Sequence, residues 1–147
     1  MKDLFQVSEL KIAYKNKQTH NVAITFSESA ERVFRKHWND ELELCESMYL
    51  LVLDRQNVVQ GIKLISIGGL SSTVCDPKKV FQTALLSNSS SIILAHNHPS
   101  GALKPSTTDI KLTQKIKQGA ELLDLTLLDH IILTPNSYYS FADEGMI

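Results

Sequence analysis

The stretch Ser91-Ile-Ile-Leu-Ala-His-Asn-His-Pro-Ser-Gly-Ala-Leu-Lys-Pro-Ser-Thr-Thr-Asp109 changes character at its first histidine. Residues 91–95 are almost entirely apolar, which is typical of a short buried strand. The residues that follow are polar and include Pro99 and Gly101, which favour a loop. We therefore expect a strand that ends at the edge of the core and delivers His96 there.

His96 and His98 stand two positions apart. In extended backbone such residues point the same way, so both imidazoles can reach one ion at about 2.0–2.1 Å. By itself a His-x-His pair is more often ordinary loop polarity, so a third ligand has to lie nearby. Asp109 is the natural candidate, because the loop after His98 can fold back towards the imidazoles. Three protein ligands would leave the fourth tetrahedral position open for water, as in zinc hydrolases.

The segment Ser106-Thr-Thr-Asp109 has a second interpretation as a helix-start capping box. Ser106 would then accept hydrogen bonds from backbone amides, and Asp109 would lie at the positive end of the helix dipole. The two interpretations are compatible, because a helix that begins here fixes the direction of the Asp109 side chain.

Apolar runs and helical spacings alternate along the rest of the chain and predict a mixed α and β fold. We find no repeat, low-complexity tract or linker, so one domain is expected. Residues 1–25 are predicted to be an N-terminal strand or hairpin extension before a domain at 26–147. The predicted helices are 27–39, 76–88 and 106–119, and the predicted strands are 48–53, 58–67, 91–95, 125–133 and 138–141.

The bulk composition excludes several classes of function. The formal charge is -1, from 15 basic and 16 acidic residues, which offers no overall attraction for nucleic acid or an anionic membrane. No apolar run approaches the roughly 20 residues of a membrane span, and the first residues lack a secretory signal, so we expect a cytoplasmic protein. Cys45 and Cys75 form no Cys-x-x-Cys pair, which argues against a disulfide framework or a thiolate zinc cage.

A zinc hydrolase also needs a carboxylate base. Four acidic residues lie at the ends of the predicted strand 48–53, and the residues alone do not separate them. They are Glu41, Glu43, Glu46 and Asp54.

The four residues His96, His98, Ser106 and Asp109 fit every fixed position of the JAMM (MPN-plus) metalloprotease signature His-x-His-x7-Ser-x2-Asp. The surrounding sequence resembles the bacterial RadC-like JAB domain, and the resemblance covers roughly residues 26–147. It is carried by Ile92-Ile-Leu-Ala-His-Asn-His-Pro-Ser-Gly101, Leu127-Leu-Asp-His-Ile-Ile132 and Tyr138-Tyr-Ser-Phe141.

This resemblance implies a curved mixed β-sheet flanked by helices, similar to the cytidine-deaminase arrangement. It also implies a zinc metallopeptidase that acts on a peptide or protein substrate. The segment Glu46-Ser-Met-Tyr-Leu-Leu-Val-Leu-Asp54 occupies the place of the family's upstream glutamate, although Met48 stands where an aromatic residue is usual. By this carry-over Glu46, rather than Glu43, would be the general base, and Ser106 would stabilise the oxyanion.

Other polar residues near the motif have open roles. His130 would be either a group that orients a metal ligand or one half of a strand-end pair with Asp129. Asn97 and Ser100 can orient the histidine loop.

The main alternative is a non-catalytic, zinc-stabilised interaction module that acts with DNA-processing partners. RadC proteins usually carry an N-terminal helix-hairpin-helix region, which we do not expect in a chain of this length, and the near-neutral charge also weakens the case for strong DNA binding. Zinc-dependent deamination is disfavoured, because that chemistry uses His-x-Glu and Pro-Cys-x-x-Cys, and neither occurs. The ligand set suits zinc best, but iron, manganese and cobalt also remain open.

Overall fold

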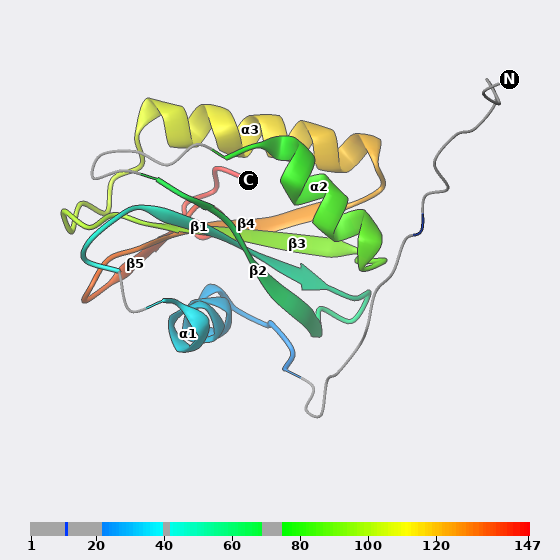
Figure 1. Ribbon diagram of the computed structural model, residues 1–147, viewed down its shortest axis with the longest axis horizontal. Helices are drawn as coiled ribbons and strands as arrows, with labels where there is room; N and C mark the ends of the chain where they lie inside the picture. The colour runs from blue at the N-terminus through cyan, green and yellow to red at the C-terminus, as the bar shows by residue number, and fades with distance from the viewer. Residues whose placement is uncertain (1–10, 12–21, 40–41, 69–74) are drawn as a thin grey trace, which may run out of the picture.

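The computed structural model describes residue 11 and residues 22–39, 42–68 and 75–147 (Figure 1). Most of the predicted N-terminal extension at 1–25 lies outside the described residues. Where it is described, Ala23 makes an isolated antiparallel bridge to Val58 and no longer strand. No helix in the described part of the chain has the length and apolarity that crossing a membrane requires.

A five-stranded mixed sheet with the strand order β2-β1-β3-β4-β5 forms the middle layer. Strands β3 and β4 are parallel, and every other neighbouring pair is antiparallel. Helix α1 covers one face of the sheet, and α2 and α3 cover the other (Figure 1). This arrangement confirms the predicted mixed sheet flanked by helices. The elements are α1 (Ser27–His37), β1 (Ser47–Leu53), β2 (Val59–Ile67), α2 (Pro77–Leu86), β3 (Ser91–Asn97), α3 (Thr107–Leu122), β4 (Thr126–Leu133) and β5 (Tyr138–Ser140).

Strands β1 and β3 are buried along their whole length. Their side chains point alternately to the two faces, and helices cover both, so each strand is apolar throughout. Leu51 packs in the cluster under α1, whereas Leu50 packs in the cluster under α2 and α3. Each fully buried leucine of this kind contributes about 1.5–3 kcal/mol to the hydrophobic stabilisation.

The pairing of β3 with β4 contains a register shift that reverses the faces of β4. Ile92 is opposite Leu127, but the next residue of β3, Ile93, is opposite Asp129, so β4 has one extra residue at this point. Leu127 therefore packs under α2 and α3, whereas Ile131 packs under α1. Strict alternation would put both on one face. The shift turns His130 to the α3 face.

Helix α3 continues past Gly119, where the sequence analysis predicted its end, and closes at Leu122. A Cβ atom on Gly119 would lie 2.7 Å from the ring of Phe81, so this glycine permits close packing of α3 against α2 and does not stop the helix. The chain leaves the helix through Asp124, which has a φ of 54°.

Candidate metal centre

The last residues of β3 and the loop after it bring two imidazoles together. The Nε2 atoms of His96 and His98 lie 3.0 Å apart, and the His96 side chain is buried. This agrees with the prediction that residues two apart in extended backbone point the same way.

Asp109, in the first turn of α3, faces the two imidazoles. Its Oδ1 lies 3.3 Å from Nε2 of His96, and its Oδ2 lies 3.6 Å from Nε2 of His98. Ligands at 2.0–2.1 Å from a tetrahedral zinc are separated from one another by about 3.3 Å. These spacings, and donor atoms that all lie within 4.8 Å of one another, fit a single metal ion held by the three predicted ligands.

Electrostatics at this site favour a cation. Burial by itself would raise the pKa of Asp109, but the adjacent His96 and His98 imidazoles outweigh burial and hold that pKa well below its usual value. The same carboxylate raises the pKa of His98. An anionic carboxylate with two imidazoles is a donor set that suits zinc, and similar sets hold iron in non-haem oxygenases.

Ser106 is the N-cap of α3, and it holds Asp109 in place. Its hydroxyl donates to Oδ2 of Asp109 at 2.7 Å, its backbone amide donates to the same oxygen at 2.7 Å, and its Oγ accepts from the Asp109 amide at 3.1 Å. The capping box is therefore confirmed, and its second residue is also a candidate ligand. The oxyanion role of Ser106 stays a prediction.

A backbone carbonyl orients the ring of His98. Its Nδ1 lies 2.6 Å from the carbonyl oxygen of Ala102, which has no hydrogen to give, so Nδ1 is the protonated nitrogen and Nε2 keeps its lone pair. The tight turn from His98 makes this contact possible, and Gly101 takes a φ of 81° in it, where a side chain would be strained.

Another imidazole orients the ring of His96. Nδ1 of His96 lies 2.8 Å from Nε2 of His130, and Nδ1 of His130 lies 2.6 Å from the Oγ1 of Thr113. His130 is completely buried, and burial lowers its pKa well below the usual value, so its ring is neutral. The role of Thr113 was not predicted from the sequence. The available signal was its place four residues after Asp109, one turn along the same face of a helix.

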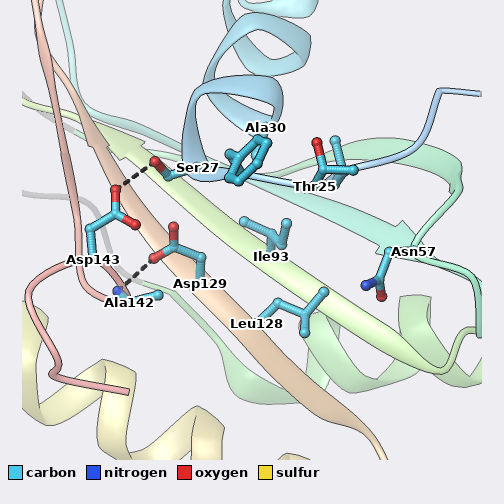
Figure 2. Close-up of a pocket in the computed structure, with 11 residues that line it drawn as sticks. Thr25, Ser27, Ala30, Asn57, Ile93, Leu128, Asp129, Ala142 and Asp143 are labelled. Atoms are coloured by element: carbon cyan, nitrogen blue, oxygen red, sulfur yellow. Dashed lines mark hydrogen bonds between the residues drawn. The ribbon is translucent and has the colours of Figure 1, made fainter.

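The alternative pairing of His130 with Asp129 is wrong at the level of side chains. The backbone amide of His130 donates to Oδ1 of Asp129 at 2.7 Å, but the Asp129 carboxylate lies on the α1 face of the sheet. Figure 2 shows it in a pocket near Asp143 and Ser27, bound to the backbone amide of Ala142. Consecutive residues of a strand point to opposite faces of the sheet, so these two side chains cannot meet.

Among the candidate bases, Glu46 is the one that the fold brings near the candidate metal ligands. It directly precedes β1, and continuing the register in which Met48 is opposite His96 puts Glu46 opposite His98. Its charge contributes to the raised pKa of His98. Asp54 follows the far end of β1, Glu43 lies on an exposed turn, and Glu41 lies outside the described residues.

Asn97 points away from its two histidine neighbours and holds the segment that carries Glu46. Its Oδ1 accepts from the Ser47 amide at 2.7 Å, and its Nδ2 donates to the carbonyl oxygens of Leu42 and Cys45 at 2.6 and 2.9 Å. Asn97 was expected to orient its own loop, and it orients the loop before β1 instead.

Comparison with known proteins gives a family match over most of the chain. The model of the RadC-like JAB domain matches residues 24–146. A UPF0758 protein of Flavobacterium johnsoniae is 44% identical over 101 residues, which are 69% of this chain and 44% of that protein. UPF0758 proteins of Methanosarcina acetivorans and Porphyromonas gingivalis are each 42% identical, over 69% of this chain and 44% and 45% of their own lengths. The match therefore spans less than half the length of these curated relatives.

Proposed function

This chain belongs to the RadC-like JAB domain family, and from that premise we propose that it is a zinc-dependent hydrolase that cleaves a peptide or isopeptide bond. His96, His98 and Asp109 would hold the metal. When bound, zinc lowers the pKa of a coordinated water towards about 7 and polarises the scissile carbonyl. The remaining work falls to side chains of this domain.

Glu46 is the proposed general base. Its carboxylate accepts a proton from the attacking water and returns the proton to the leaving amine, so the amide C–N bond breaks and a carboxylic acid and an amine form. Asn97 keeps the Glu46 segment in register with β3 through the Ser47 amide. Ser106 donates to the oxyanion in the proposed mechanism, for which its hydroxyl has to leave Oδ2 of Asp109.

One observation carries the proposal: the Nε2 atoms of two histidines and the carboxylate of Asp109 converge near Glu46, the acid that directly precedes β1. A site that served only to stabilise the fold would be closed by a fourth protein ligand. Among the described residues, the only group of three or more potential ligands comprises His96, His98 and Asp109. Three ligands with a nearby carboxylate favour an open, hydrolytic site.

The test compares the zinc-loaded wild-type chain with two matched variants on fluorogenic peptide and lysine-isopeptide libraries. We expect Glu46→Gln to retain zinc and to lose about 10²–10⁴-fold in kcat, the usual contribution of a general base. Glu43→Gln, the same change three positions away on an exposed turn, should leave kcat unchanged.

Wild-type protein that binds zinc stoichiometrically and hydrolyses no member of either library would contradict the proposal, as would full activity of Glu46→Gln. Such a result would favour the interaction module. DNA binding measured over a range of salt concentrations, with and without zinc, would then test that module for a nucleic-acid partner.

A further inference from the structure

Four residues on three elements form a closed chain of contacts next to the proposed metal site. They are Asp109 and Thr113 on α3, His130 on β4 and His96 on β3. We propose that Thr113 and His130 are positioning residues that hold His96 in the tautomer that presents Nε2 to the metal. This inference deepens the function proposed above and rests on its metal site, but its first test needs neither metal nor activity.

The chain begins at the Thr113 hydroxyl, which has a single hydrogen. That hydrogen goes to the backbone carbonyl oxygen of Asp109, at 2.7 Å and one turn back along α3. Oγ1 can therefore only accept in its 2.6 Å contact with Nδ1 of His130. His130 must then carry its proton on Nδ1.

A neutral imidazole has one N–H group and one lone pair. With the proton on Nδ1, the Nε2 atom of His130 accepts in its 2.8 Å contact with Nδ1 of His96. His96 is therefore protonated at Nδ1, and its Nε2 keeps the lone pair that a metal ligand needs. The direction in which the Thr113 hydroxyl donates its hydrogen therefore fixes the tautomer of His130 and, through it, that of His96.

Packing keeps the His130 ring in the orientation that makes both hydrogen bonds, to Thr113 and to His96. The ring of Phe141 stacks on it, with centroids 4.8 Å apart and planes 12° apart, and the Phe141 amide donates to the His130 carbonyl oxygen at 3.0 Å. Both side chains are fully buried, so the His130 ring cannot turn without opening the core.

The chain also links two of the proposed ligands. It starts at the backbone of Asp109 and ends at the ring of His96, whose Nε2 lies 3.3 Å from the Asp109 carboxylate. Residues that orient a ligating histidine in this way typically contribute 10–100-fold to metal affinity. His98 needs no such residues, because the Ala102 carbonyl has the same role.

The first test measures ring ¹⁵N shifts of the metal-free wild-type chain by NMR at mildly alkaline pH, where imidazoles are neutral. We expect protonated Nδ1 and unprotonated Nε2 in His96, His98 and His130. A proton on Nε2 of His96 would mean that the hydrogen bonds run in the opposite direction, and it would overturn the proposal.

The second test measures zinc affinity by competition with a chromophoric chelator. Thr113→Val removes the hydroxyl while nearly preserving shape, and we expect it to weaken zinc binding by about 10–100-fold, with Thr113→Ser restoring it. Thr83→Val is the matched control, because the Thr83 hydroxyl makes the same bond one turn back along α2, to Lys79, and lies away from the histidines. Unchanged affinity in Thr113→Val would overturn the proposal.

The two proposals can fail separately. Wild-type protein that binds zinc without hydrolysing any peptide would remove the hydrolase function, while the expected NMR shifts and the Thr113→Val affinity would still support the positioning role. Conversely, an active enzyme in which Thr113→Val keeps full zinc affinity would support the hydrolase and remove the positioning role.

Discussion

The side-chain oxygen of Asn97 lies 2.7 Å from the backbone amide nitrogen of Ser47, and this contact ties the last residue of β3 to the first residue of β1. Glu46 directly precedes Ser47. The position of the proposed base therefore depends on Asn97, which lies between the two candidate histidine ligands in the sequence and points away from both.

We expect Asn97→Ala to lower the free energy of unfolding by roughly 2–4 kcal/mol, because it leaves one buried amide and two carbonyl oxygens without their partner. Hydrolysis should fall more than zinc affinity, because the loop that carries Glu46 is released while His96 and His98 stay on β3. Urea unfolding and a zinc titration would measure both. Asn136→Ala, on an exposed turn, is the control, and equal losses in the two variants would contradict the role of Asn97.

Ser106→Ala should lower the free energy of unfolding by about 0.5–2 kcal/mol through loss of the helix cap. Zinc affinity should also fall, because Oδ2 of Asp109 loses its hydrogen bond from the hydroxyl. Activity at saturating zinc then separates the two roles. A residual loss of about 10²–10³-fold in kcat would support the oxyanion role, whereas full recovery would restrict Ser106 to holding Asp109. Asp76→Ala, which removes the N-cap side chain of α2, is the control.

Alkylation of the Cys75 thiol should require a higher pH than alkylation of an ordinary cysteine. Burial, helped by the charge of Asp76, raises the pKa of the Cys75 thiol to about 11. Because the thiolate is the reactive form, alkylation of the folded chain should stay slow at neutral pH and rise towards pH 11. Mass spectrometry after timed iodoacetamide pulses would measure it, with the urea-unfolded chain as the reference. If the alkylation rate of the folded chain were half-maximal at the ordinary thiol pKa, the predicted rise in the pKa of Cys75 would be contradicted.

The same shift has a consequence for stability. Between the unfolded pKa of about 8.5 and the folded pKa the native state holds the proton more tightly than the unfolded chain does. The contribution of Cys75 is therefore fully present below that range and is lost as the pH rises through it. Cys75→Ala should reduce the loss of stability over this interval in urea unfolding curves measured at a series of pH values.

We expect Gly119→Ala to destabilise the protein. Alanine gains about 1 kcal/mol in helix propensity, but its Cβ would lie 2.7 Å from the Phe81 ring, and overpacking of this kind costs about 1–3 kcal/mol. In a Phe81→Leu background the same change should become stabilising, because the ring is gone. A double-mutant cycle by urea unfolding would measure the coupling, and additive effects would show that α2 and α3 do not clash there.

The sequence by itself determined the local parts of the candidate metal centre. His96 and His98 share a direction because of the period of extended backbone, and Asp109 is fixed by the helix that Ser106 caps, so spacing along the chain was enough. The mixed fold was predictable for the same reason, because apolar periodicity acts within each element. The end of α3 was misplaced, since a glycine used for packing has the same appearance in the sequence as one that ends a helix.

Only the tertiary structure decided what surrounds these ligands. His130 faces His96 because β4 has one extra residue opposite β3, and no local pattern reports the register between two strands. The residues alone left Glu46 and Asp54 open and the family resemblance favoured Glu46, while the structure puts the start of β1, where Glu46 lies, beside the end of β3. Spacing along the chain sets the direction of a side chain within its element, whereas the partner that it meets depends on pairing between elements that are distant in sequence.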